Sequence, residues 1–348
     1  MGKATPPPRI QGTAETRGVS GNNQRRNHPY ARRTLVQALA TLAANANLPG
    51  FFTGRIWTGV SKSACVPVLN CYSCPGALGS CPIGALQAVA TTRRFSFSFY
   101  LVGFLALIGL FVGRLFCGWA CPFGWVQDLL HRIPVRKRSI PRKAARILGY
   151  GKYAMLAVLV LLLPFALADA YGIGVPWFCK LVCPAGTLQA GIPLLIANAP
   201  LRAAAGWLFS WKGFLLAVTV TASLFLLRPF CRFACPLGAF YALFQRLSLY
   251  RMQVDKTACT RCGACAHACG LDLRPQEDPN HPDCIRCGVC VQACPTHALT
   301  AGFRHPETAD LAETAGNVKT ADNTEIADNT GTADNVGTTA NAETAGKE

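Results

Sequence analysis

Eight cysteines between residues 259 and 294 restrict the fold of this chain more than any other feature of its sequence. They form two runs of the same spacing, C-x2-C-x2-C-x3-C, and Pro295 follows the last cysteine of the second run. Three thiolates at this spacing wrap one face of a cubane [4Fe–4S] cluster, and the fourth reaches the cluster of the other run. The pattern therefore predicts a small α+β domain over residues 251–303 whose core consists mostly of two clusters.

The spacing assigns four thiolates to each cluster. The first set is Cys259, Cys262, Cys265 and Cys294. The second set is Cys284, Cys287, Cys290 and Cys269. Zinc also accepts four thiolates, but structural zinc sites normally use two separated C-x2-C pairs. Gly263 and Gly288 each follow a ligand, where the absence of a side chain lets the backbone approach cluster sulfide.

The chain has 18 cysteines in all, so a disulfide framework is an alternative. Such frameworks belong mainly to short secreted chains, whereas these cysteines fall in tight C-x2-C and C-x3-C groups that suit metal. The sequence therefore favours metal ligation over disulfides.

Residues 34–250 are predicted to form an α-helical polytopic membrane domain. Apolar residues make up 51% of the chain and charged residues 15%, which is unusual for a soluble globular protein. Three segments have the length and apolarity of bilayer-spanning helices: Phe95–Gly113, Tyr153–Ile173 and Gly206–Leu227.

A fourth apolar run, Thr34–Leu48, is short and contains Asn45 and Asn47. By length it is re-entrant or interfacial, but it can span a bilayer if its helix continues through Phe52. We count it as a helix, which gives about four transmembrane helices.

The basic residues indicate the orientation of these helices. The formal net charge is +17, and eight lysines and arginines lie between Arg132 and Lys152. The positive-inside bias places this loop, and with it both termini, in the cytoplasm of a multi-pass protein of the inner membrane. Because the basic residues gather beside apolar spans, we expect no nucleic-acid partner.

The two ends of the chain are predicted to lack a fold. Residues 1–33 form a basic flexible arm without an apolar run. Residues 304–348 repeat Glu-Thr-Ala and Thr-Ala-Asp-Asn units and cannot bury enough apolar surface to fold.

The membrane part is internally duplicated. The segment from Arg114 to Gly124 matches the segment from Arg228 to Gly238, 114 residues later, and both contain C-x3-C-P. The octapeptide that begins at Cys81 likewise resembles the one that begins at Cys183. Each half is therefore a helix, a cysteine loop, a second helix and a cysteine turn.

The duplication predicts further cluster sites. The cytoplasmic turns supply four thiolates: Cys117, Cys121, Cys231 and Cys235. Six more cysteines gather at the opposite face, enough for another cluster with spare thiols: Cys65, Cys71, Cys74, Cys81, Cys179 and Cys183. Which four of these bind is open, and Cys65 is the weakest member. Buried cysteine can also be a small hydrophobic core residue.

Other redox cofactors lack a recognisable site. None of the six histidines lies inside a predicted span, and no C-x-x-C-H, G-x-G-x-x-G or P-loop pattern occurs. We expect no haem, flavin or nucleotide, and no catalytic residue. The electron donor, a quinol or a protein, and the acceptor are then supplied from outside.

The double cluster motif and the C-x3-C-P turns resemble the NapH-like family of membrane polyferredoxins. The resemblance covers residues 32–300, and it implies four helices, cytoplasmic termini and electron exchange between a quinol pool and a redox partner protein. The chain would then be the electron-transfer subunit of an oxidoreductase complex, with quinol dehydrogenase activity as one option. The groups at Cys71/Cys74 and Cys179/Cys183 exceed the simple family pattern.

Two other functions fit the same motifs. A related group of membrane ferredoxins assists the assembly of copper oxidases, which would make this chain an accessory reductase for metal-cofactor maturation. A redox-sensing or scaffold subunit is the third hypothesis.

Overall fold

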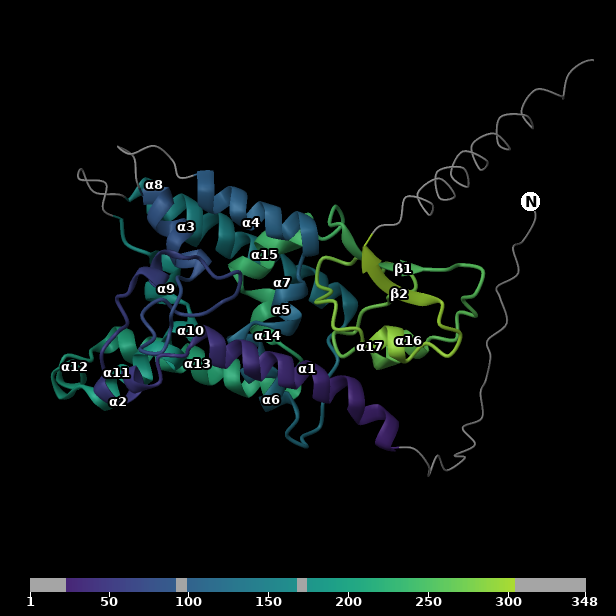
Figure 1. The fold of residues 1–348 in the computed structure, drawn as a ribbon, viewed down its shortest axis with the longest axis horizontal. Helices are drawn as coiled ribbons and strands as arrows, with labels where there is room; N and C mark the ends of the chain where they lie inside the picture. The colour runs from purple at the N-terminus through teal and green to yellow at the C-terminus, as the bar shows by residue number, and fades with distance from the viewer. Residues whose placement is uncertain (1–22, 92–98, 168–173, 304–348) are drawn as a thin grey trace, which may run out of the picture. The chain divides into compact units, whose positions relative to one another are not determined.

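The computed structural model describes residues 23–91, 99–167 and 174–303, and they are mostly helical (Figure 1). The first helices are α1 (Asn23–Ala44), α2 (Pro49–Thr53), α3 (Pro82–Thr91), α4 (Phe99–Val112), α5 (Leu115–Trp119), α6 (Pro122–His131), α7 (Arg142–Ala154) and α8 (Leu163–Ala166). They are followed by α9 (Trp177–Leu181), α10 (Pro184–Gly186), α11 (Ile192–Ala197), α12 (Ala199–Ala203), α13 (Trp207–Phe225), α14 (Pro229–Phe233) and α15 (Pro236–Phe244).

The cysteine-rich segment at the end of the described chain adds α16 (Ala264–Ala268) and α17 (Val289–Gln292). It also contributes β1 (Tyr250–Val254) and β2 (Leu299–Phe303), which pair in a two-stranded sheet. A 3-10 turn, η1 (Val60–Ser63), and two π-helical segments, η2 (Met155–Leu162) and η3 (Thr187–Gly191), complete the elements. The described residues up to Gly302 belong to one compact unit.

Among the described residues, two helices are long and apolar enough to cross a membrane. One runs through α7, η2 and α8 over Arg142–Ala166, and the other is α13. The helix over Arg142–Ala166 begins earlier than the predicted span, inside the basic loop, because α7 is amphipathic. Two parts of the predicted spans lie outside the described residues. They are residues 168–173 at the end of the Tyr153–Ile173 span and residues 95–98 at the start of the Phe95–Gly113 span.

The expected fourth span is not one continuous helix. Helix α1 begins at Asn23, within the predicted arm, and ends at Ala44. The Asn45 side chain donates to the Thr41 carbonyl at 2.9 Å, and the Asn47 side chain donates to the Pro75 carbonyl at 2.8 Å. Pro49 then opens α2. The asparagines thus bond to backbone carbonyls and end the helix before Phe52. The predicted arm at 1–22 and tail at 304–348 lie outside the described residues.

Large apolar side chains are exposed along the helices. Extensive exposed apolar surface is rare on a soluble monomer and marks contact with a membrane or with a partner. The set includes Leu107, Leu110, Phe111, Leu161, Leu162, Phe165, Phe214 and Val218. These side chains support membrane association of α4, of the α7–α8 helix and of α13.

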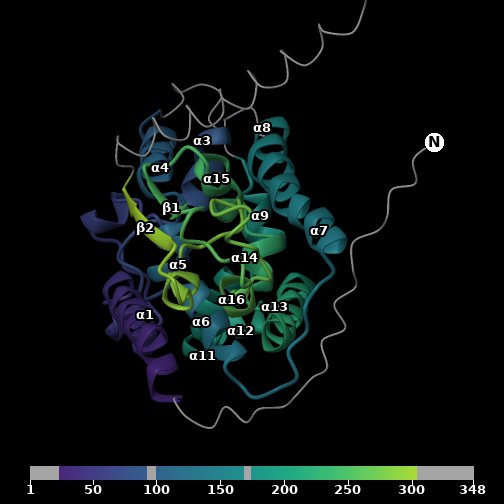
Figure 2. The same ribbon diagram turned by 90° about the vertical axis from the view of Figure 1, so that its right-hand side faces the viewer.

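The helices pack around the cysteine loops. Helix α6 lies between α1 and α13, and α15 packs against α4 and α7 (Figure 2). Their common core includes Cys81, Cys117, Cys121, Cys183 and Cys235 together with aromatic side chains such as Phe123 and Phe178. Cysteines from distant parts of the chain therefore share one buried core.

Candidate metal centres

The eight cysteines of the C-terminal segment gather into two sets. Cys259, Cys262, Cys265 and Cys294 line one small cavity. Cys269, Cys284, Cys287 and Cys290 line a second. In each set three cysteines come from one run and the fourth comes from the other run. The spacing predicts this arrangement.

The backbone beside both sets adopts the same unusual conformation. Arg261 and Gly263 have φ of 54° and 77°, and their counterparts Arg286 and Gly288 have φ of 52° and 79°. Left-handed residues on both sides of one cysteine turn successive N–H groups toward a common point, which makes a nest for an anion. The thiolates and sulfides of a cluster are such an anion.

Burial works against charge on these thiols. Desolvation raises the pKa of Cys284 to about 11 and that of Cys290 to about 12. A buried thiolate is stable only beside positive charge, which the iron of a cluster supplies. Among the described residues, no three His, Cys, Asp or Glu side chains converge on a point that would hold one metal ion. The sulfurs instead surround cavities, and this donor set fits [4Fe–4S] clusters.

The two duplicated turns bring a third set of four cysteines together. Cys117, Cys121, Cys231 and Cys235 lie within electrostatic range of one another. Cys121 and Cys235 precede the prolines that begin α6 and α15, and each Sγ accepts a backbone N–H from the glycine three residues later at 3.4 Å. Helix N-termini stabilise thiolates in this way.

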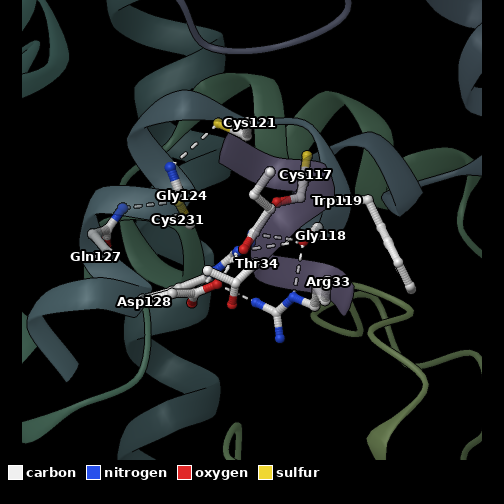
Figure 3. Close-up of polar contacts among 12 residues, drawn as sticks. Arg33, Thr34, Cys117, Gly118, Trp119, Cys121, Gly124, Gln127, Asp128 and Cys231 are labelled. Atoms are coloured by element: carbon white, nitrogen blue, oxygen red, sulfur yellow. Dashed lines mark hydrogen bonds and ion pairs between the residues drawn. The ribbon is translucent and has the colours of Figure 1, made fainter. Parts of the chain in front are cut away.

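Gln127 adds a side-chain donor to this third set. Its Nε2 donates to the Sγ of Cys231, in the opposite turn, at 3.1 Å. Figure 3 shows this bond beside the one from Gly124 to Cys121. The glutamine thus orients a cysteine of the other repeat, a role that its sequence position alone did not indicate.

Two buried arginines tie the repeats together. Arg114 donates to the carbonyl of Cys231 at 2.9 Å, and Arg228, its counterpart, donates to the carbonyl of Cys117. Asp128 accepts from Arg228 at 2.6 Å. It also pairs with Arg33 of α1, as Figure 3 shows. Because each arginine bonds to the cysteine turn of the other repeat, the pair fixes the two turns relative to each other.

Asp283 pairs with Arg114 at 3.4 Å and with Lys152. Desolvation raises the pKa of Asp283, but Arg114 and Lys152 outweigh it, so the net shift is downward. Neither aspartate was predicted from the sequence. For Asp128 a signal was available, because it is an isolated charge in the apolar sequence of α6 and such charges are seldom buried without a partner.

The C-terminal segment docks directly on this third set. Gly118, between Cys117 and Cys121, packs so closely that an added Cβ would overlap the carbonyl oxygen of Ile285. Trp119 Nε1 donates to the Arg286 carbonyl at 3.0 Å, and Gln245 Nε2 donates to the Cys284 carbonyl at 3.0 Å. The loop that carries Cys284 and Cys287 therefore touches the loop that carries Cys117 and Cys121.

The six remaining cysteines divide into four and two. Cys71, Cys81, Cys179 and Cys183 line a cavity of about 400 Å³. Cys74 is buried, with its Sγ 3.6 Å from Asn45 Oδ1, and the Sγ of Cys65 lies 3.9 Å from the Val66 carbonyl. Neither of these two lines that cavity.

Comparison with known proteins finds two family models that match segments of this chain. One family model, described as a 4Fe-4S binding domain, matches residues 95–141, 154–197 and 207–252. A second, also described as a 4Fe-4S binding domain, matches residues 280–300. No solved structure matches.

Several curated proteins are similar over about half of this chain. The methylamine utilization ferredoxin-type protein MauN of Paracoccus denitrificans is 35% identical over 49% of this chain and 53% of its own length. The putative electron transport protein YccM of Escherichia coli is 28% identical over 49% of this chain and 44% of its own length. The regulatory protein NosR of Stutzerimonas stutzeri is 27% identical over 53% of this chain and 24% of its own length. By these matches the chain is similar to ferredoxin-type 4Fe-4S proteins and to electron-transport proteins, and it spans about half the length of MauN.

Proposed function

We propose that this chain passes single electrons through [4Fe–4S] clusters between a membrane quinol pool and a redox partner protein. The contact of Gly118 with Ile285 carries the proposal, because it joins the loops of two cysteine sets without intervening side chains. The names of two relatives, an electron transport protein and a ferredoxin-type protein, support it.

Three of the proposed clusters follow from the cysteine sets. The first is held by Cys259, Cys262, Cys265 and Cys294. The second is held by Cys269, Cys284, Cys287 and Cys290. The third is held by Cys117, Cys121, Cys231 and Cys235. When bound, each such cluster takes up and releases one electron.

The protein's own residues then position and insulate these centres. All four cysteines of the third set are buried, which keeps water away from the thiolates. Arg114 and Arg228 hold the two turns in register through the backbone carbonyls of Cys231 and Cys117. The docked loop at Ile285 keeps the path between the second and third sets short.

The membrane and the quinol complete the proposal. Apolar side chains exposed on α4, the α7–α8 helix and α13 suit lipid contact, and we propose four membrane-associated helical segments with cytoplasmic termini. A cavity of about 490 Å³ adjoins the first turns of the α7–α8 helix, and its lining is mostly charged, with Arg146, Arg232 and Asp278 among its members beside Tyr150, Tyr153 and His281. We propose that a quinol head group binds there, as part of a NapH-like membrane polyferredoxin.

Stopped-flow spectroscopy in proteoliposomes tests the donor. We expect menaquinol or ubiquinol analogues to bleach the cluster absorbance. A replacement of Tyr153 by Leu should slow the bleaching by quinol but not by dithionite, which needs no binding site. If no quinol reduces any cluster while a soluble ferredoxin or flavodoxin does, the quinol part of the proposal is wrong.

A redox-sensing role is the second candidate. It is favoured by one observation, the similarity to NosR, which is named a regulatory protein. A sensor would be reduced by the same donors but would not pass electrons on. Catalytic oxidation of quinol by an added acceptor protein, over many turnovers per chain, would exclude it.

A further inference from the structure

We infer that Cys71, Cys81, Cys179 and Cys183 bind a fourth [4Fe–4S] cluster, and that Cys65 and Cys74 are not ligands. The inference rests on the proposed cluster chemistry of the chain and extends it to a site outside both the ferredoxin segment and the duplicated cytoplasmic turns. No cysteine spacing in the sequence selects these four.

The first observation is the cavity itself. The four cysteines line it together, although they are far apart in the sequence. Cys71 lies in the loop before α3 and Cys81 directly precedes α3, whereas Cys179 lies in α9 and Cys183 directly precedes α10. Cys183 lies within electrostatic range of Cys71, Cys81 and Cys179. Cys74 does not line this cavity.

The second observation is that the local geometry repeats that of the third set. Cys183 precedes Pro184, and its Sγ accepts the backbone N–H of Gly186 at 3.3 Å, as Cys121 does from Gly124 at 3.4 Å. Cys179 precedes Cys183 at the same C-x3-C spacing as Cys117 and Cys121. The turn at Cys179 and Cys183 is therefore built like a turn of the third set.

The third observation is a matching pair of glutamines. Gln87 follows Cys81 by six residues and donates to the Sγ of Cys179 at 3.2 Å. Gln127 follows Cys121 by six residues and donates to the Sγ of Cys231 at 3.1 Å. In both sets a glutamine from one C-P-x-G turn orients the first cysteine of the opposite turn.

A glutamine of the turn at Cys183 contacts Cys71 and so distinguishes it from Cys74. Gln189 follows Cys183 by six residues, and its Oε1 accepts the backbone N–H of Cys71 at 2.9 Å. Gln87 and Gln189 thus each bond to the cysteine loop of the other half. Cys71 takes the place that a C-x3-C spacing would give to residue 77, which is alanine.

Positive charge beside the cavity suits the cluster. Four thiolates around a [4Fe–4S]²⁺ core leave a net charge of about −2, which burial penalises unless cations lie close by. Lys180 and Lys212 line the cavity, and Lys212 Nζ donates to the Cys179 carbonyl at 3.2 Å. Lys62 lies within electrostatic range of Cys71.

Two neighbouring cysteines of one loop provide the test and its control. We expect anaerobically purified full-length protein to contain about 16 irons, by the four-iron count per cluster. Cys71→Ala should lose about four irons and one reduced EPR signal, and Cys74→Ala and Cys65→Ala should lose none. Equal losses from Cys71→Ala and Cys74→Ala, or no loss from Cys71→Ala, would overturn the inference.

A variant that retains every cysteine ligand tests the site without the loss of iron that a misfolded protein would also show. Gln87→Leu removes the hydrogen bond to Cys179, and loss of such a bond to ligand sulfur lowers a cluster's reduction potential. We expect one EPR-monitored potential to shift down while the iron content and the other potentials stay constant. Gln127→Leu should shift a different signal. If Gln87→Leu shifts none, the cluster is not there.

The outcomes also separate this inference from the proposed function. Protein with about 12 irons that are all insensitive to Cys71→Ala retains the first three clusters and loses only the fourth. Protein without iron and sulfide contradicts both.

Discussion

At the scale of single residues, hydrogen bonds and charges from distant positions decide which cysteines come together. The spacing of residues 259–294 predicted two sets of four, because each run must wrap a cluster locally and lend one thiolate to the other. The choice between Cys71 and Cys74 could not be predicted. It depends on Gln189, more than 100 residues away, whose side chain accepts the backbone N–H of Cys71. It also depends on Asn45, whose Oδ1 accepts a hydrogen bond from the Sγ of Cys74.

The buried ion pairs at Asp128 provide a prediction at this scale. Asp128→Asn removes the counter-charge of the buried Arg228 and one partner of Arg33, and breaking a buried ion pair typically costs about 3–5 kcal/mol. Chemical unfolding in detergent should show a loss of this size. Glu277→Gln is the matched control, because its pair with Arg274 is exposed and such pairs contribute about 0–1 kcal/mol. A similar small loss for both variants would contradict the role given to Asp128.

At the scale of elements, apolar length predicted the helices better than it predicted their ends. The α7–α8 helix and α13 fall where the apolar runs are, because burial or lipid contact needs continuous apolar surface. The start of α1 at Asn23 was missed because its basic residues suggested an unfolded arm. Contacts from distant residues account for it: Arg33 pairs with Asp128, and Gln37 Nε2 donates to the Gly118 carbonyl at 2.9 Å.

The close contact between the α5 turn and the ferredoxin loop can be broken by one methyl group. Gly118→Ala would force the Ile285 carbonyl away, and overpacking of this kind typically costs about 1–3 kcal/mol. Hydrogen exchange should then accelerate in the loop over residues 284–288. Gly213→Ala on α13, where an added Cβ meets nothing within 4 Å, should leave exchange there unchanged. Normal protection of the loop in Gly118→Ala would show that the contact is not tight.

At the scale of the whole molecule, the cysteine sets connect two parts that the sequence separates. The apolar segment before Tyr250 and the polar segment after it were predicted as distinct domains. The structure joins them through Arg114, Lys152 and Asp283, and through Arg286, which donates to the Val112 and Gln245 carbonyls at 2.9 Å. Sequence could not predict this docking, because each contact pairs residues from different segments.

The ferredoxin segment should depend on its clusters for stability. Its buried side chains form two small groups, one with Met252 and Leu299 and another with Leu271, Leu273 and Ile285. So little apolar burial cannot hold a fold without metal. Removal of iron by ferricyanide and a chelator should make residues 255–303 sensitive to protease while α13 stays protected. Unchanged resistance after complete iron removal would contradict this dependence.

The central claim, that these cysteines hold [4Fe–4S] clusters, is tested most directly by Mössbauer spectroscopy on anaerobically purified ⁵⁷Fe-labelled protein, with acid-labile sulfide measured on the same sample. The eight ferredoxin-segment cysteines alone predict at least about eight irons in [4Fe–4S] form with matching sulfide, and the third and fourth sets raise the number to about 16. Bound zinc in place of iron, with no sulfide and no paramagnetic signal after reduction, would contradict the account.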